Sequence, residues 1–363
     1  MLSLLAVALG VTAATVQAAA ATPEPQTLRT YQGTTISAFA QDGPLVAWFS
    51  RGRQHCNGVH VISLANGLQT ALPQQTARNV TCRWEVGASP VRLALGGSTA
   101  LWTLQARSPI PFDYLIGAAV ADPKERRYQE IAHTLSGSGL WLGGISGDGS
   151  TLVYGVTSVD YADEAGCLAG TSPCTLKVVG GGVYRVEGRP RLVPGTDRTG
   201  AVAVAAAGGA VAYVPTTTVG KQGRPVATAE LAIEVVDATT GASISHVRTE
   251  GTPLALALSA KVVSTLERTP LGLRVAWYER TSGQPLGSLP VSRKASPELT
   301  ATDTTIVYRV GRSIRAVDVA TSKARTLALA AAVPVGLSLE GARLAWAENL
   351  PGSARIRTLT LRP

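Results

Sequence analysis

The feature that most constrains the fold of this chain is a short phrase that recurs along it. In its clearest form, at residues 145–154, an apolar stretch leads into Gly147-Asp148-Gly149 and a second apolar stretch ends at Tyr154. Two short apolar segments around a glycine turn are typical of two strands joined by a tight hairpin. With the six further copies, the chain contains seven units. These copies lie at residues 39–48, 95–102, 207–213, 303–308 and 340–346, with a degenerate one at residues 258–264.

Each unit continues with two more predicted strands. In the first unit the four strands are expected at residues 36–40, 45–49, 59–64 and 68–72, with an Asn66-Gly67 hairpin turn before the last. In the fourth unit they are expected at residues 202–206, 211–214, 231–236 and 243–248. Aromatic residues spaced by about 38 to 59 residues match a propeller blade plus loops of variable length. We therefore predict an all-β chain that forms a seven-bladed β-propeller of four-stranded antiparallel blades.

The two ends of the chain are predicted to meet in the last blade. Residues 335–339, 344–347 and 355–361 supply only three strands, whereas a lead strand at residues 26–31 belongs to no unit. Pairing between them would close the ring and cover an edge that otherwise favours aggregation. Residues 22–363 are thus expected to form one propeller domain. The first strand of several units is rich in Ala and Gly, which suits crowding near a central axis.

Two stretches resemble known propeller repeats. The phrase at residues 147–154, Gly-Asp-Gly-Ser-Thr-Leu-Val-Tyr, resembles the Ser-Pro-Asp-Gly-x-x-Leu-x-Phe blade signature of TolB-like β-propellers. Residues 233–241 are similar to the third strand and turn of many bacterial propeller repeats. The proline of the signature is absent before Asp148, and the Trp-Asp pair of WD repeats is absent. The resemblance implies a propeller fold and a surface for protein partners, and it implies nothing catalytic.

Residues 1–21 are predicted to be a secretory signal peptide. An apolar, small-residue run ends in four alanines at residues 18–21, and the Pro-bearing residues 22–25 follow, as at a signal cleavage site. Neither Lys nor Arg precedes the run, so a start further upstream and an uncleaved anchor both stay open. We expect a protein that is secreted or held in the cell envelope. We also expect a monomer with no stable membrane span after signal cleavage.

The four Cys fall into two local pairs, Cys56 with Cys82 and Cys167 with Cys174. An even number in an exported chain favours disulfides, although four Cys allow three connectivities. Neither pair has the Cys-x-x-Cys type of spacing that zinc sites use. All four lie in predicted loops on one side of the ring. Local pairing would join two neighbouring loops through Cys56–Cys82 and close a third loop on itself through Cys167–Cys174.

The side of the ring that carries the Cys residues is the predicted binding face. The connections between second and third strands are long in the first four units, at residues 51–58, 105–113, 157–175 and 215–228. Long, braced loops on a rigid scaffold often bind partners, although drift in loop length is an equal alternative. The expected contact residues are Arg51, Arg53, Trp84, Asp113, Tyr114, Tyr161, Lys221 and Arg224.

The formal net charge of +9 bears on the choice of partner. Residues 300–363 contain nine Lys or Arg against four Asp or Glu. This excess favours an anionic envelope polymer or lipid headgroup, or else it is a solvated exterior on outer strands. Nucleic acid is not expected, because the chain is predicted to be exported and its basic residues are not interleaved with aromatic ones.

Candidates for metal binding and catalysis are few. Asp160, Asp163 and Glu164 offer clustered oxygens for Ca²⁺ but lack the spacing of a calcium loop, so no cofactor is expected. Nucleophile-elbow, zinc-protease and phosphate-loop motifs are absent, and the first strands offer mainly Arg92 and Glu298 as polar residues. We therefore expect a non-catalytic binding or scaffold propeller that presents its loops to a protein or an envelope polymer. The alternative is a hydrolase or lyase that acts on glycan or peptide in the central funnel.

Overall fold

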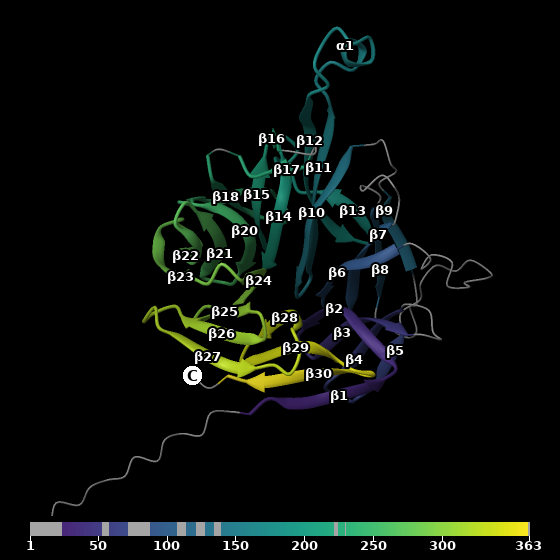
Figure 1. Ribbon diagram of the computed structural model, residues 1–363, viewed down its shortest axis with the longest axis vertical. Coiled ribbons are helices and arrows are strands. Elements are labelled where there is room, and N and C mark those ends of the chain that lie inside the picture. The colour runs from purple at the N-terminus through teal and green to yellow at the C-terminus, as the bar shows by residue number, and fades with distance from the viewer. Residues whose placement is uncertain are drawn as a thin grey trace, which may run out of the picture.

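The computed structural model describes residues 24–52, 58–71, 88–106, 114–120, 128–133, 139–220, 224–228 and 230–361. These residues form seven four-stranded antiparallel sheets arranged as a ring (Figure 1). The first strand of each sheet lines the centre of the ring. The predicted seven-bladed all-β fold is thereby confirmed, whereas the predicted signal peptide at residues 1–21 lies outside the described residues.

The first three blades follow the chain in order. Blade 1 contains β2 (Thr34–Asp42), β3 (Leu45–Gly52), β4 (Gly58–Ser63) and β5 (Gln69–Ala71). Blade 2 contains β6 (Ala88–Gly96), β7 (Thr99–Ala106), β8 (Tyr114–Val120) and β9 (Tyr128–His133). Blade 3 contains β10 (Leu140–Asp148), β11 (Thr151–Tyr161), β12 (Leu176–Glu187) and β13 (Arg189–Leu192), with α1 (Glu164–Leu168) between its second and third strands.

The remaining blades repeat this order. Blade 4 contains β14 (Gly200–Ala207), β15 (Ala210–Thr216), β18 (Ala232–Asp237) and β19 (Ser243–Arg248), and the small hairpin β16 (Thr218–Val219) with β17 (Pro225–Val226) interrupts it. Blade 5 contains β20 (Thr252–Leu258), β21 (Val262–Thr269), β22 (Gly272–Glu279) and β23 (Pro285–Val291). Blade 6 contains β24 (Ala295–Ala301), β25 (Thr305–Val310), β26 (Ser313–Asp318) and β27 (Ala324–Leu329). Blade 7 contains β28 (Val335–Glu340), β29 (Arg343–Leu350), β30 (Ser353–Thr360) and β1 (Gln26–Gln32).

The ring is closed by pairing of the two ends of the chain, as predicted. β1 runs antiparallel to β30, from Gln26 opposite Thr358 to Gln32 opposite Ser353 (Figure 1). Two side chains add to this ladder. Tyr31 packs against Trp48 of blade 1 with ring centroids 5.2 Å apart, and Arg357 donates to the Pro25 carbonyl at 2.6 Å. β1 therefore joins the last blade to the first and covers the edge of β30.

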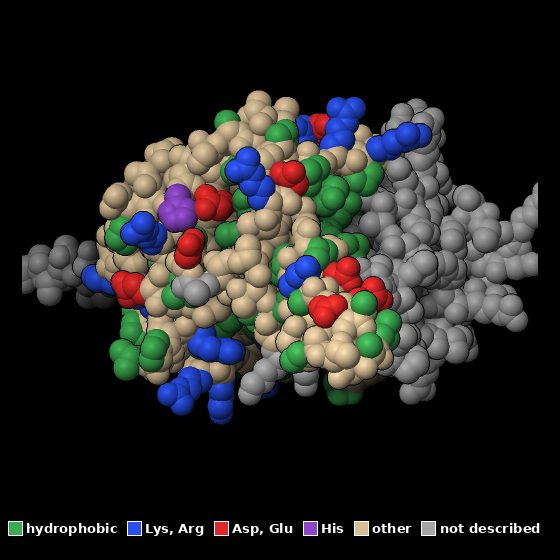
Figure 2. All heavy atoms as spheres, turned by 90° about the horizontal axis from the view of Figure 1, so that it is seen from above, with side chains coloured by type: hydrophobic (Ala, Val, Ile, Leu, Met, Phe, Trp, Pro, Cys, Tyr) green, Lys and Arg blue, Asp and Glu red, His purple; other side chains and the backbone are tan. Residues whose placement is uncertain are grey.

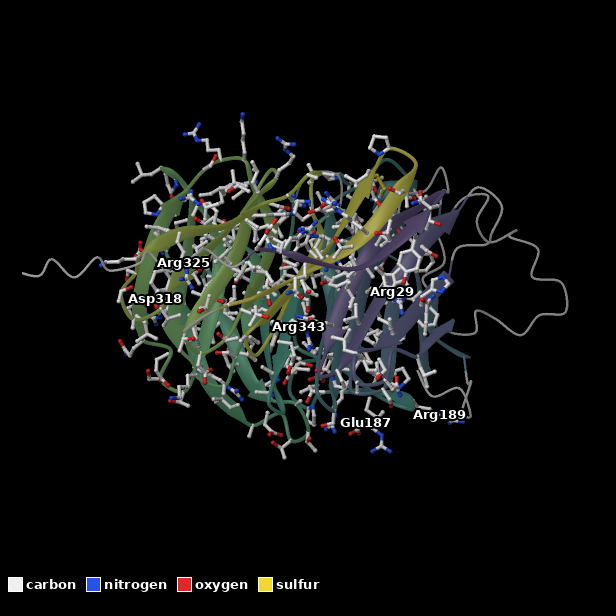
Figure 3. The ribbon with its side chains drawn as sticks, turned by 90° about the horizontal axis from the view of Figure 1, so that it is seen from below. Arg29, Glu187, Arg189, Asp318, Arg325 and Arg343 are labelled. Atoms are coloured by element: carbon white, nitrogen blue, oxygen red, sulfur yellow. A yellow bond between two sulfur atoms is a disulfide. The ribbon has the colours of Figure 1, made fainter. Side chains whose placement is uncertain are left out.

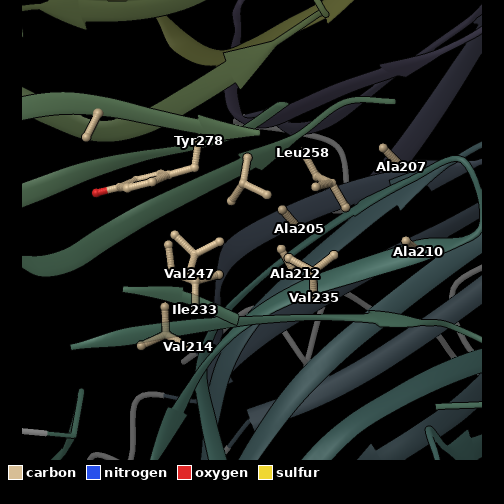
Figure 4. Packing of buried hydrophobic residues seen from close by; sticks show 12 residues of the cluster. Ala205, Ala207, Ala210, Ala212, Val214, Ile233, Val235, Val247, Leu258 and Tyr278 are labelled. Atoms are coloured by element: carbon tan, nitrogen blue, oxygen red, sulfur yellow. The ribbon is translucent and has the colours of Figure 1, made fainter. Parts of the chain in front are cut away.

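Small and aromatic side chains share the packing between blades. The second strands of most blades bury a large aromatic residue, such as Trp48, Trp102 and Trp346. Blade 5 has Ser264 at this position, and Trp277 lies opposite it on β22, fully buried. In blade 5 the large aromatic residue is therefore supplied by the third strand instead of the second. Figure 4 shows the alanines and valines of blade 4 packed with residues of blade 5 in one buried cluster.

Candidate binding face and central channel

A hairpin of blade 3 projects from the ring on the side where second and third strands are connected, which we call the B–C side. The ladder of β10 with β11 ends at Ser158, whereas β11 continues to pair with β12 as far as Tyr161 opposite Leu176. This end of the hairpin carries α1 away from the seven sheets (Figure 1). We call residues 159–180 the blade-3 arm. The predicted loop at residues 157–175 is corrected by this finding, because its first residues continue β11 and Glu164–Leu168 is helical.

Local contacts fix the tip of the arm. Asp163 is the N-cap of α1, and its carboxylate accepts from the Gly166 N–H at 2.9 Å and from the Ser172 hydroxyl at 2.8 Å. These two hydrogen bonds lower the pKa of Asp163. A Cβ on Gly166 would lie 2.1 Å from this carboxylate, so a larger residue there would displace the carboxylate from the cap. The Cys167–Cys174 disulfide, with Cα atoms 4.8 Å apart, closes the same loop as predicted. The tip is therefore held by a cap, a hydrogen-bonded turn and a covalent link.

The arm exposes large apolar side chains between charged ones. The exposed fractions are 44% for Tyr161, 81% for Leu168, 37% for Leu176 and 49% for Val179. The charged residues of the arm are Asp160, Asp163, Glu164 and Lys177, and all four are exposed. Figure 2, which looks down on α1, shows acidic side chains grouped beside hydrophobic ones. Such apolar side chains favour burial against a second surface.

Other groups lie near the base of the arm. The Arg224 guanidinium is 5.9 Å from the centroid of the Trp141 ring, within the range of a cation–π contact. β16 lies beside β12, and Val226 on the paired strand β17 is exposed. The B–C side of blades 3 and 4 thus presents aromatic, basic and apolar groups together.

Only some of the predicted contact residues lie among the residues that the structure describes. Tyr161 and Arg224 are exposed on the B–C side. Arg51 near the end of β3 and Tyr114 at the start of β8 border connections on the same side. Arg53, Trp84, Asp113 and Lys221 lie outside the described residues, as do Cys56 and Cys82. A binding role for these residues stays a prediction.

The three acidic residues considered for Ca²⁺ are not brought together. Asp163 is occupied by the cap of α1, and Asp160 accepts from the adjacent Tyr161 N–H at 2.8 Å. Among the described residues, the carboxylates that do converge belong to Asp42, Asp148 and Glu340, whose oxygens lie within 4.8 Å of one another. Hard cations prefer oxygen donors of this kind. This group lies on the opposite side of the ring, at the hairpin turns between first and second strands.

Three adjoining cavities that share lining residues lie along the centre of the ring, and we call them the central channel. A middle cavity of about 200 Å³ is lined by the first strand of every blade. On the B–C side it meets a cavity of about 400 Å³ that includes Arg92 and Glu298. On the opposite side it meets one of about 660 Å³ that includes Asp148, Asp303 and Glu340. Most of the lining residues are Ala, Gly and Leu, as expected from the composition of the first strands.

Asp42 and Asp148 tie the turns of neighbouring blades together. Asp42 accepts from the backbone N–H groups of Gly97 in blade 2 and of Gly149 in blade 3, the latter at 3.1 Å. Asp148 accepts from the Gly208 N–H of blade 4 at 2.7 Å. Burial raises the pKa of Asp42. The carboxylates therefore have a structural role at the mouth of the channel, whatever else they bind.

Sequence reasoning missed these three acidic residues, although the repeat contained the signal for them. Asp42, Asp148 and Glu340 each precede a turn glycine at the same position of the repeated phrase. The glycines that follow have φ of +51°, +54° and +55°, a region that favours glycine. Because equivalent positions of all blades face one axis, acids at this position are expected to meet.

The two polar residues predicted on first strands do line the channel, but both have partners. Arg92 donates to the Gly143 carbonyl at 2.9 Å. Glu298 pairs with Arg309, with 2.5 Å between its Oε2 and the guanidinium Nε. These contacts join strands of the ring.

Comparisons with known proteins support the fold. A chain of the mitotic checkpoint complex is 11% identical over 97% of this chain and 98% of its own length, with a TM-score of 0.54. The Dos1 propeller is 8% identical over 93% of this chain and 96% of its own length, with a TM-score of 0.50. Neither a protein-family model nor a curated protein matches the sequence. Likeness at such low identity shows the fold alone, which is that of a β-propeller, and the TolB-like resemblance remains one of fold.

Within the described ranges, no helix has the length and apolarity needed to cross a membrane.

Proposed function

We propose that this protein is an extracytoplasmic, non-catalytic binding or scaffold propeller that presents the B–C side of its ring to a protein partner. The observation that carries the proposal is the blade-3 arm, a braced projection with Leu168 and Val179 exposed on it. A recognition element that is ordered before binding loses less conformational entropy on binding. Exposed apolar side chains on such an element supply the burial that stabilises a complex.

A protein partner is favoured over an anionic polymer by the way the basic residues are used. At least five arginines among residues 300–363 bond to groups within the ring, namely Arg309, Arg312, Arg343, Arg355 and Arg357. Arg325 lies near Asp318 and interacts with it electrostatically (Figure 3). Two of these five arginines pair with carboxylates, and the other three bond to neutral oxygens. The net charge is unchanged, but the guanidinium groups are held against the ring rather than extended toward a polymer. This favours the solvated-exterior interpretation.

A hydrolase or lyase in the central funnel is the second candidate, and the carboxylates at the channel mouth favour it. Burial raises the pKa of Glu340, and the nearby Asp42 and Asp148 raise it further. A carboxyl group with a raised pKa next to a second carboxylate is an arrangement that acid–base catalysis uses. Against this, Asp42 and Asp148 already accept backbone hydrogen bonds that tie blades together.

The proposal is tested by recovering partners of the tagged mature protein from its own cell envelope after cross-linking. The parent is compared with a Tyr161→Ser/Leu168→Ser variant of the arm. A Leu271→Ser/Leu286→Ser variant of blade 5 is the matched control, since both leucines are exposed there.

A partner that parent and control recover, and that the arm variant loses, supports binding through the arm. Equal recovery by the parent and both variants removes the arm from the proposal. If no partner is recovered at all, hydrolysis of glycan and peptide substrates is assayed with Glu340→Gln as the test of the second candidate.

A further inference from the structure

The blade-3 arm carries a charge opposite to that of the whole protein. Residues 159–180 contain three acidic residues, Asp160, Asp163 and Glu164, against Lys177 alone, which gives the arm a net charge of −2. The full chain carries +9. The arm is therefore an acidic element on a basic protein, and its sign is the opposite of what composition alone predicts for the binding surface.

The acidic and apolar side chains of the arm stand on the same short segment of the chain. Asp160 precedes Tyr161, and Glu164 begins the helix that ends at Leu168. The hydrogen bonds to Asp163 lower its pKa further, and at neutral pH it carries a negative charge. The result is a group of exposed apolar side chains with acidic ones beside it (Figure 2), and with Lys177 opposite Asp160 on the paired strand.

We propose that the arm binds a protein surface on which an apolar stripe is flanked by Lys or Arg side chains. This inference rests on the proposed function and narrows the class of partner. The exposed apolar side chains, of which Leu168 is the most exposed, are removed from water when they pack against this stripe. The carboxylates meet the basic flanks, which guides encounter and disfavours partners of the wrong charge.

The charge of the arm separates this partner from other occupants of an apolar surface. An anionic lipid surface or wall polymer repels Asp160 and Glu164 at short range. A second copy of this chain would have to offer a basic apolar stripe of its own. Each of these occupants is a separate outcome of the experiment.

The probe is a pair of synthetic amphipathic helical peptides of the same length. One peptide has leucine on one face and lysine on the other, and its counterpart has glutamate in place of lysine. Each peptide is immobilised, and binding of the mature protein is measured by interferometry over a series of NaCl concentrations. We expect binding to the lysine peptide that weakens as salt rises, and no binding to the glutamate peptide.

Three variants locate the interaction. Leu168→Ser is expected to weaken binding to the lysine peptide by about tenfold, and Asp160→Lys/Glu164→Lys to weaken it by at least about as much. Asp163 is left intact because it caps α1. Leu271→Ser, at a side chain 94% exposed on blade 5, is the matched control and should bind like the parent. The inference is overturned if the protein binds both peptides equally, or if the arm variants bind the lysine peptide as well as the parent does.

The remaining outcomes distinguish this inference from the proposed function. Leu168-dependent binding to vesicles of phosphatidylcholine with phosphatidylglycerol overturns it in favour of a lipid surface. Leu168-dependent self-association in size-exclusion chromatography overturns it in favour of a second copy. If cross-linking still recovers an envelope protein through the arm while the lysine peptide is not bound, the proposed function stands and the basic partner is excluded.

Discussion

Replacing Glu340 with Gln tests the electrostatics at the mouth of the channel. The oxygens of Asp42, Asp148 and Glu340 lie within 4.8 Å of one another. At that separation two unit charges repel by about 3–4 kcal/mol at an effective dielectric constant of about 20. Partial exposure of Asp148 and Glu340 screens this repulsion, so removal of one charge should raise the free energy of unfolding by about 1 kcal/mol. If the ring unfolds as one unit, Tm rises by about 1–2 °C.

The sign of the pH dependence follows from the pKa of Glu340. Burial raises this pKa, and the charges of Asp42 and Asp148 raise it further. A carboxyl group with a higher pKa in the folded protein contributes stability that is present below its unfolded pKa and is lost as pH rises through the folded pKa. Gln resembles the protonated form. The gain from Glu340→Gln should therefore be seen at pH 7 and disappear as pH falls toward about 4.

Thermal unfolding of parent and variant over this pH range measures the effect, and Glu279→Gln is the control of opposite sign. Hydrogen bonds from Ser282 and Thr281 lower the pKa of Glu279 to about 2. Its stabilising contribution is therefore present at neutral pH and lost as pH falls, so Glu279→Gln should lower Tm at pH 7. A Glu340→Gln variant less stable than the parent at pH 7 refutes repulsion. If chelation with EDTA abolishes that difference, the three carboxylates hold a cation.

Four further changes test how the ring and the blade-3 arm are held together. Glu267→Ala should lower the free energy of unfolding by about 3–5 kcal/mol, because the fully buried carboxylate is bonded to an arginine and a tyrosine. Glu298→Ala, at a side chain 34% exposed, should cost about 1 kcal/mol or less, and similar values for both in urea unfolding would contradict this. Deletion of residues 25–32 removes β1 and should lower Tm by many degrees, whereas an unchanged Tm rules out closure as a source of stability. Cys167→Ser/Cys174→Ser should leave the Tm of the ring unchanged and speed proteolysis within the arm, and an arm that resists protease as well as the parent would show the disulfide to be dispensable.

The sequence predicted the ring well because its signals are local and repeated. A glycine turn between two apolar segments specifies a hairpin at each copy, and the pairing within a blade is between neighbours in the chain. The closing strand at residues 26–32 is a long-range pairing, yet it followed from counting three strands in the last unit. The degenerate unit at residues 258–264 also forms a complete blade although its second strand lacks the aromatic residue. The sheet needs one large residue near Ser264, and Trp277 on the adjacent strand supplies it.

The arm was only partly predicted, because loop length does not reveal how a loop folds. Residues 157–175 were expected to be irregular. Thr157, Val159 and Tyr161 at the end of β11 instead favour extended backbone, and the strand continues beyond its blade. The helix α1 is too short to have a hydrophobic period, so its cap at Asp163 was the only local sign of it. Asp163 was also a candidate ligand for Ca²⁺, but in the structure its carboxylate caps α1.

The carboxylates at the channel mouth were missed for a geometric reason. Asp42 and Glu340 are almost the full chain apart in sequence, and they meet only because the ring closes between blades 1 and 7. No spacing within a single segment signals such a contact. It becomes visible once equivalent repeat positions are placed around one axis. For repeat proteins, charged residues are therefore best compared by their position in the repeat rather than by their distance along the chain.

The two sides of the ring differ in what a substitution can change. On the side of the glycine turns, Asp42, Asp148 and the turn backbones bond from blade to blade, so a change there alters the stability of the whole ring. On the B–C side, the blade-3 arm extends past the ladder of β10, and its tip is held by contacts within itself. Variation in the arm therefore costs the ring little. The partner proposed for the arm can therefore change by substitution in the arm without a change of fold.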